Sequence, residues 1–341
     1  MTNKKTYDNL DVVKWLSALL IIIIHTNPFH EIEIIEFFTK DVVARIAVPL
    51  FFAISGFLFF RKITFENGKI VRTSQNLAYL LRYVKHLIII YLGASAFYLL
   101  YKIPMWYSIG WWGLPALKDY LVCFFLSGSE YHLWYIIASI YGIILFYLLL
   151  SFIRLDIMKY LCIAGWLIEC LLYSYSWIGI ENISVLTWMT SHFSGCFDAA
   201  FRAIPLMSVG LFCAIFPSKK IYVISSILTT VVYVSEVSFL YFISSNDGKY
   251  SYLLITPLLT YFLLRWLLSM NLQFKNRSIP KWMRDTSLII YIVHPMVIYL
   301  LDFAGMPKGI MHWLAVTMIS VGAASIFISV KNKLKLIYRT P

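Results

Sequence analysis

The chain has 341 residues, of which 60% are hydrophobic and only 13% are charged. Its mean hydropathy is +0.76. Because soluble domains carry about 25% charged residues, this composition excludes a soluble globular protein and predicts a membrane protein. The net charge of +12 does not indicate nucleic-acid binding, since the basic residues lie in short segments between apolar stretches and form no surface stripe.

Apolar stretches as long as a membrane span, which needs roughly 20 residues, recur from end to end. They predict an all-α polytopic protein with ten transmembrane helices, both ends in the cytoplasm and a single domain over residues 1–341. This orientation places most lysines and arginines in the inner loops, as the positive-inside rule requires. The predicted spans are residues 10–26, 42–61, 86–101, 132–152, 159–174, 198–216, 221–243, 251–270, 287–303 and 310–330.

Two segments between these spans are also predicted to be helical. Residues 77–83, in the inner loop 62–85, have leucines at helical spacing beside Arg82 and Lys85, which is typical of an amphipathic helix on the membrane surface. The apolar segment 114–126 contains two charged residues and is too short to span the bilayer comfortably. It is therefore predicted to be an outer interfacial or re-entrant helix.

The first helix carries three ionisable groups, which are costly at membrane depth and mark a candidate site. Lys14 and His25 are eleven residues apart, so they project from one face, about 16 Å apart along the axis. Asp11 precedes Lys14 by three residues and can pair with it. A purely structural role of these residues stays open. In that interpretation Lys14 reaches the inner membrane surface and His25 caps the outer end of the helix.

Further charged groups cluster toward the outer half of the predicted bundle. Arg45 follows Asp41 by four residues near the start of the second span. Glu130 and His132 open the fourth span. Asp198 and Arg202 open the sixth, also four residues apart, so mutual neutralisation explains them equally well.

Glu169, Glu236 and His294 are further ionisable groups inside predicted spans. Glu169 and Glu236 have no basic partner nearby in the sequence and are weak candidates for a site. His294 precedes Pro295 in the ninth span. Since proline frees a backbone carbonyl, we expect the histidine to satisfy it.

Four motifs in chain order resemble the membrane acyltransferase family 3. The first helix of that family carries an aspartate, then an arginine, ten residues and a histidine, whereas this chain has Asp11, Lys14 and His25. Lysine keeps the charge but loses the planar fork that suits phosphate. The other three motifs are Ala44–Phe57, Tyr131–Tyr135 and Tyr291–Pro295.

Within that family the chain is most similar to the membrane domains of vancomycin-resistance serine racemases. In those proteins the membrane domain is linked to serine supply and a cytoplasmic racemase domain follows. Because the sequence stops at Pro341, we expect that a racemase domain is absent or was removed.

The resemblance implies a ten-helix enzyme of the bacterial plasma membrane that acylates an envelope glycan or another small hydroxyl-bearing acceptor. The acyl donor would be cytoplasmic acetyl-CoA, and no metal is expected because the five cysteines show no ligand spacing. His25 would act as general base or acyl carrier, Arg45 would stabilise the oxyanion, and His132 with Glu130 would orient the acceptor. The residues expected to hold the CoA head are Asp11, Lys14, Arg82 and Lys85.

Two other functions stay open. One is a transporter or exporter of a small polar solute such as serine, with Glu169, Glu236 and the outer charges along its path. The other is a membrane scaffold without chemistry, which explains neither the spacing in the first helix nor the four motifs. Lipid is expected as a partner and nucleic acid is not, while the oligomeric state stays open.

Overall fold

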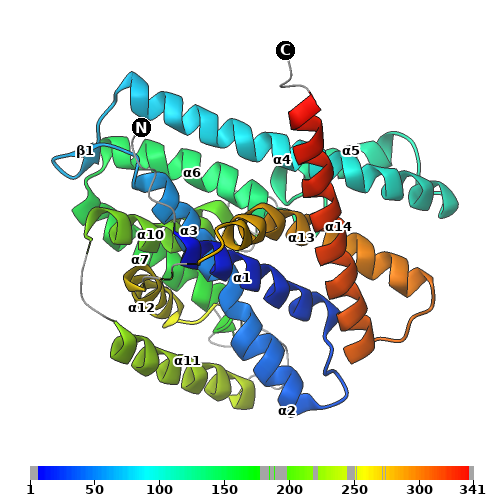
Figure 1. The fold of residues 1–341 in the computed structure, drawn as a ribbon. Helices are drawn as coiled ribbons and strands as arrows, with labels where there is room; N and C mark the ends of the chain where they lie inside the picture. The colour runs from blue at the N-terminus through cyan, green and yellow to red at the C-terminus, as the bar shows by residue number, and fades with distance from the viewer. Residues whose placement is uncertain are drawn as a thin grey trace. The chain divides into compact units, whose positions relative to one another are not determined.

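The described part of the chain is almost entirely helical. In this computed structural model it comprises residues 7–176, 184, 188, 198–217, 222–243, 250, 252–270, 272 and 274–337. Apart from helices it contains one short antiparallel hairpin, β1 (Phe65–Glu66) and β2 (Lys69–Ile70), with Phe65 opposite Ile70 (Figure 1). Seven helices within these residues are long and apolar enough to cross a membrane. The protein is thus a multi-pass membrane protein.

The helices belong to two compact units whose segments alternate along the chain. Unit 1 consists of Met1–Phe51, Ser218–Phe239 and Leu258–Pro341, and unit 2 of Phe52–Pro217 and Leu240–Pro257. Neither unit is one contiguous segment of sequence. The single domain predicted over residues 1–341 therefore stays a prediction about the whole chain, and each unit is described by itself.

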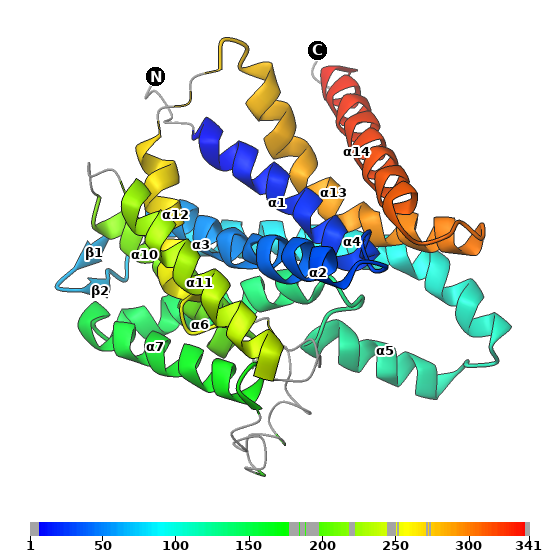
Figure 2. The same ribbon diagram turned by 90° about the horizontal axis from the view of Figure 1, so that it is seen from below.

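Unit 1 is organised around the packing of α1 on α13, which run side by side (Figure 2). Their apolar faces share a core with α14, formed by Ala18, Ile22, Ile290, Val297 and Val316. The helices of this unit are α1 (Asp8–Thr26), α2 (Glu33–Glu36), η1 (Phe37–Val43), η2 (Ala44–Ile46), the start of α3 (Ala47–Phe60), most of α11 (Val223–Ile243) and of α12 (Thr256–Ser269), α13 (Ser278–Phe303) and α14 (Ile310–Ile337).

Unit 2 is built around the buried helix α6. Its neighbours α4 and η5 pack against it, and α7 and α10 pack against η5. The α3 and α10 backbones approach so closely that a side chain at Gly56 or Gly210 would overlap the opposite helix. The remaining bounds are α4 (Ser74–Ser108), α5 (Leu114–Leu126), α6 (Trp134–Phe152), α7 (Leu155–Leu172), η5 (Ala199–Ala203) and α10 (Ile204–Ile215).

Three helices, α4, α13 and α14, are longer than the sequence pattern predicts, and α14 ends at Ile337 rather than at residue 330. The amphipathic segment 77–83 and the span 86–101 form the single helix α4, so a separate surface helix was wrong. Nothing between them breaks a helix, and the start is fixed by Thr73, whose Oγ1 accepts a hydrogen bond from the Asn76 N–H at 3.2 Å. Helix α13 begins at Ser278 rather than at residue 287, because its polar first turns lie outside the apolar pattern.

The other predicted elements fall where the sequence places them. Segment 114–126 is helix α5 with the predicted bounds. The predicted spans 159–174, 198–216 and 251–270 correspond to α7, to η5 with α10, and to α12, which are shorter or more charged than the seven long apolar helices. A total of ten spans and the cytoplasmic position of both ends stay predictions.

Candidate active site

The charge cluster at the N-terminal end of the first helix forms as the spacing predicts. Lys14 Nζ lies 3.0 Å from Asp11 Oδ1, and both side chains are largely buried. Helix α13 adds Arg284, whose Nη1 is 3.8 Å from Asp11 Oδ2 and whose Nε is 3.2 Å from Asp285. The sequence pattern missed Arg284, because it assigns this residue only to an inner loop.

His25 lies in the last turn of α1, against a second histidine. Its ring stacks on that of His294 from α13, with centroids 5.3 Å apart and 29° between the planes. The helix ends directly after it, where Asn27 adopts a left-handed conformation at φ 46° and bonds back to the Ile23 carbonyl. His25 is therefore held between the end of one helix and the middle of another, and does not simply cap a helix in solvent.

Hydrogen bonds to its own helix fix the ring of His294. Its Nδ1 lies 3.2 Å from the Ile290 carbonyl oxygen, and it also bonds the Tyr291 carbonyl. The latter is the group that Pro295 leaves without a helical donor, as the sequence predicts. A neutral His294 therefore carries its proton on Nδ1 and leaves Nε2 unprotonated.

Arg45 is close enough to His25 for their charges to interact. Its Nε and Nη2 both lie 3.3 Å from Asp41 Oδ1, which confirms the predicted i,i+4 pair. The pair sits where η1 and η2 interrupt regular α-helical winding, an irregularity often found at functional sites. The Tyr233 hydroxyl of α11 donates to the Val42 carbonyl at 3.1 Å and pins this segment.

Glu130 and His132 belong to unit 2. Glu130 is paired with Lys102 of α4, with Oε1 2.9 Å from Nζ, and the same ammonium donates to the Ser129 carbonyl at 2.6 Å. His132 is buried, and the ring of Tyr98 meets it edge-on at 5.1 Å. The sequence placed Lys102 outside the helix, so it missed this partner of Glu130.

The two predicted inner-loop contacts, Arg82 and Lys85, are not equivalent. Arg82 lines a pocket of about 630 Å³ on unit 2. Lys85 is exposed one turn further along α4 and does not line that pocket. In unit 1 the structure brings Asp11 together with Lys14, and His25 together with Arg45. The other predicted site residues belong to unit 2: Arg82, Lys85, Glu130 and His132.

A second charge cluster in unit 2 is centred on Arg202. Its guanidinium is bound by Glu169 and by Asp198, the latter 2.9 Å away. Tyr252 and Tyr173 cover it at 4.4 and 4.7 Å. The predicted Asp198 pair is confirmed. The partner of Glu169 is 33 residues away in the sequence, which is why no local pattern reveals it.

Replacing Arg202 by alanine is expected to destabilise the protein by about 3–5 kcal/mol, because it leaves two buried carboxylates without their counter-charge. Arg154→Ala is the matched control. It removes an arginine–aspartate pair whose side chains are 60% and 68% exposed, so the expected loss is below about 1 kcal/mol. Thermal unfolding in nanodiscs measures both. Equal losses in the two variants would show that the Arg202 cluster is not stabilising.

Comparison with known proteins identifies the family of this chain. The family described as an acyltransferase domain matches residues 7–329, and the chain belongs to it. The family expected from the sequence motifs is therefore confirmed. No solved structure matches the chain significantly.

The similar curated proteins are racemases. An amino-acid racemase of Enterococcus faecalis is 27% identical over 358 residues, which cover 98% of this chain and 47% of that protein. A serine/alanine racemase of Enterococcus gallinarum is 23% identical over 344 residues, covering 95% of this chain and 46% of that protein. The chain thus spans less than half the length of these relatives.

Proposed function

We propose that this protein is an integral membrane O-acyltransferase of the bacterial plasma membrane. It moves an acyl group, acetyl in the first instance, from cytoplasmic acyl-CoA to a hydroxyl of an envelope glycan or another small acceptor. Membership of the acyltransferase family over residues 7–329 carries the proposal. The placement of Lys14 and His25 on one helix supports it, because a charged group and a base then lie about 16 Å apart along one axis.

The inner end of α1 is proposed to hold the anionic head of the donor. Lys14 is fixed by Asp11, and Arg284 approaches the same carboxylate from α13. A phosphate placed there would meet two cations already oriented by one acid. Arginine has the planar donors that lysine lacks. Arg284 on α13 would therefore supply the guanidinium group that the family has on its first helix. Arg82 and Lys85 stay proposed donor contacts in unit 2.

The outer end of α1 is proposed to carry the chemistry. His25 takes the proton from the acceptor hydroxyl while the oxygen attacks the thioester carbonyl. Arg45 donates hydrogen bonds to the oxyanion that develops. The C–S bond then breaks, and the CoA thiolate takes the proton back from His25. Alternatively His25 first accepts the acyl group on its own nitrogen and passes it on. Glu130 and His132 stay proposed contacts of the acceptor.

A second candidate function is passage of a small amino acid such as serine across the membrane. It is favoured by the relative named serine/alanine racemase and by the buried charges around Arg202. The two functions differ in their need for CoA. Uptake of labelled serine into proteoliposomes without CoA would support transport and would count against the enzyme.

The decisive measurement is acetyl-CoA turnover by the full chain in nanodiscs, followed by the free thiol released. We expect slow release without acceptor and faster release when envelope glycan fragments are added. Protein that is folded, binds no CoA and releases no thiol would overturn the proposal. Binding without release would leave the donor site in place and identify the acceptor as the missing component.

Changing Lys14 tests the donor site separately from the chemistry. Lys14→Ala is expected to raise KM for acetyl-CoA about 10- to 100-fold, because the donor then loses a hydrogen bond to a charged group. The change in kcat is expected to be smaller. Lys14→Arg restores the charge and is expected to bind the donor at least as well as the parent. Steady-state kinetics at varied acetyl-CoA would show this. An unchanged KM in Lys14→Ala would remove Lys14 from the donor site.

A further inference from the structure

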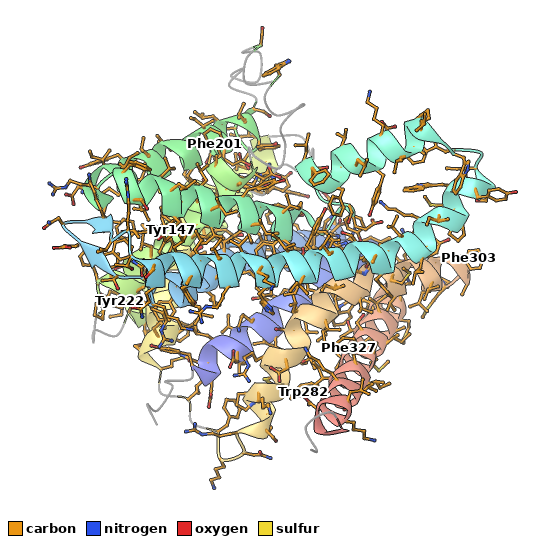
Figure 3. The ribbon with its side chains drawn as sticks, turned by 90° about the horizontal axis from the view of Figure 1, so that it is seen from above. Tyr147, Phe201, Tyr222, Trp282, Phe303 and Phe327 are labelled. Carbon is orange, nitrogen blue, oxygen red and sulfur yellow. The ribbon has the colours of Figure 1, made fainter. Side chains whose placement is uncertain are left out.

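Helices α13 and α14 of unit 1 run side by side (Figure 3). Near one end His312 Nε2 of α14 lies 3.1 Å from Asp302 Oδ1 of α13. Near the other end Trp282 Nε1 of α13 donates to the Ser325 hydroxyl of α14 at 3.2 Å. Because the order of these contacts along α14 is the reverse of that along α13, the two helices are antiparallel. The contacts also fix which turns of the two helices face each other.

Between these two contacts, α14 buries polar side chains on its packing face. His312 and Ser320 are 1% and 0% exposed, and Val316 between them is fully buried as well. Since the three residues are four apart, they share one face of the helix. We call α14 strip the residues of this segment that have a buried polar atom without a hydrogen-bond partner within the described residues: His312 (Nδ1), Trp313 (Nε1), Thr317 (Oγ1) and Ser320 (Oγ). Because an unpaired polar group costs free energy in the interior of a membrane protein, the strip is suited to a ligand with several hydrogen-bonding groups.

The α14 strip leads from the Asp302–His312 contact to the depth of the stacked histidines. Ser320 lies eight residues beyond His312 on α14, and His294 lies eight residues before Asp302 on α13. In antiparallel helices both are therefore about 12 Å from that contact along the axis. The strip thus begins at the end of α13 and ends level with the ring of His294, on which the ring of His25 stacks.

Ser320 and His294 also border the same apolar core. On α13, His294 lies between Ile290 and Val297 at helical spacing. On α14, Val316 lies one turn before Ser320. Ile290, Val297 and Val316 belong to one buried cluster, to which α1 contributes as well. Ser320 thus lies on the side of α14 that faces His294.

The other end of the strip reaches the surface of the protein. The side chain of Asp302 is 37% exposed, and Lys308, whose Nζ lies 4.0 Å from it, is 67% exposed. In the turn between the helices, no atom of the described residues lies within 4 Å of the Cβ positions of Gly305 and Gly309. The carboxylate of Asp302 favours the tautomer of His312 with the proton on Nε2, so the buried Nδ1 is an acceptor for a hydroxyl.

We propose that the acceptor of the acyl transfer binds along the α14 strip, between α13 and α14. A hydroxyl remote from the reacting one donates to His312 Nδ1, and the hydroxyls of Thr317 and Ser320 bind oxygens further along. The reacting hydroxyl then lies at the depth of His25. Because the strip is about 12 Å long, it fits two linked sugar units and is longer than a free amino acid such as serine. This inference rests on the proposed acyl transfer and adds the place where its acceptor binds.

Steady-state kinetics of the full chain in nanodiscs test this inference. The acceptor probes are N-acetylglucosamine and the peptidoglycan disaccharide in which it is linked to N-acetylmuramic acid. We expect the disaccharide to be the better acceptor. The double variant His312→Leu, Ser320→Ala is expected to raise KM for the disaccharide about tenfold, because two hydrogen bonds are lost, and to leave KM for acetyl-CoA unchanged. Ser329→Ala removes an exposed hydroxyl of the same helix, bonded to the Ser325 carbonyl, and is expected to change neither value.

Two further measurements do not depend on catalysis. Ser320→Ala removes a buried hydroxyl without a partner, so it is expected not to lower the unfolding temperature, whereas loss of a structural hydrogen bond would lower it. Ser320→Cys is expected to react with a small charged methanethiosulfonate, more slowly when the disaccharide is present. Met318→Cys is the control, because Met318 is 66% exposed on the outer face of α14, where lipid excludes a charged reagent.

The outcomes separate this inference from the proposed function. A parent protein that releases no thiol with any acceptor would contradict the acyl transfer itself. In an active parent, three results would each overturn the acceptor site alone: a parental KM in the double variant, no preference for the disaccharide, or failure of the reagent to modify Ser320→Cys.

Discussion

Replacing His25 by alanine is expected to lower acyl transfer about 10²- to 10⁴-fold, the usual contribution of a positioned general base. The substitution removes the ring that stacks on His294 and lies near Arg45, and leaves the Asp11–Lys14 pair untouched. KM for acetyl-CoA should therefore change little. The rate of thiol release in the presence of acceptor measures the effect, with kcat and KM determined separately.

His30→Ala is the matched control for that experiment. His30 is exposed in the segment after α1, and its Nδ1 lies 3.3 Å from the Asn27 carbonyl oxygen of its own turn. Its loss is expected to leave the rate unchanged. Both variants must show the unfolding temperature of the parent. A folded His25→Ala protein with parental activity would exclude His25 from the chemistry.

Gly210→Leu is expected to prevent unit 2 from folding. The backbone of α10 at Gly210 touches the backbone of α3 at Ala53 and Phe57, so a side chain there can be accommodated only if the two helices separate. Small residues allow such close approach between membrane helices. The cost should exceed the about 1–3 kcal/mol of an ordinary overpacked core, because backbone rather than a flexible side chain must move.

The control for this substitution is Gly322→Leu. Gly322 lies in α14, and no atom of the residues that the structure describes lies within 4 Å of its Cβ position. The yield of monodisperse protein in size-exclusion chromatography and the unfolding temperature measure both variants. We expect aggregation of Gly210→Leu and parental behaviour of Gly322→Leu. Monodisperse Gly210→Leu protein with the parental unfolding temperature would show that α3 and α10 do not pack this closely.

The sequence predicts those features that depend on neighbours a few residues apart. Asp11–Lys14, Asp41–Arg45 and Asp198–Arg202 lie one helical turn apart, and all three pairs form. Long apolar runs likewise reveal where helices lie. The error at α4 has the same origin. Hydropathy marks where lipid contact begins, whereas the helix itself begins at Ser74, twelve residues before the predicted span.

Contacts between distant segments could not be predicted in this way. Arg284 reaches Asp11, and Arg202 reaches Glu169, only because separate helices pack together. No spacing in a single sequence encodes which helices are neighbours. The stacking of His25 on His294 is of the same kind. Both residues lie in motifs that the sequence brings out, but their proximity comes from the packing of α1 on α13.

The packing of α1 on α13 has a consequence for biosynthesis. Roughly 250 residues separate the end of one helix from the start of the other. At about 5–20 residues per second, the ribosome needs roughly 12–50 s to make them. During that time the first helix stands in the bilayer with Asp11, Lys14 and His25 and without its final neighbour. The candidate active site can therefore assemble only after α13 has been made, and until then the ionisable groups of α1 lack the contacts that α13 supplies.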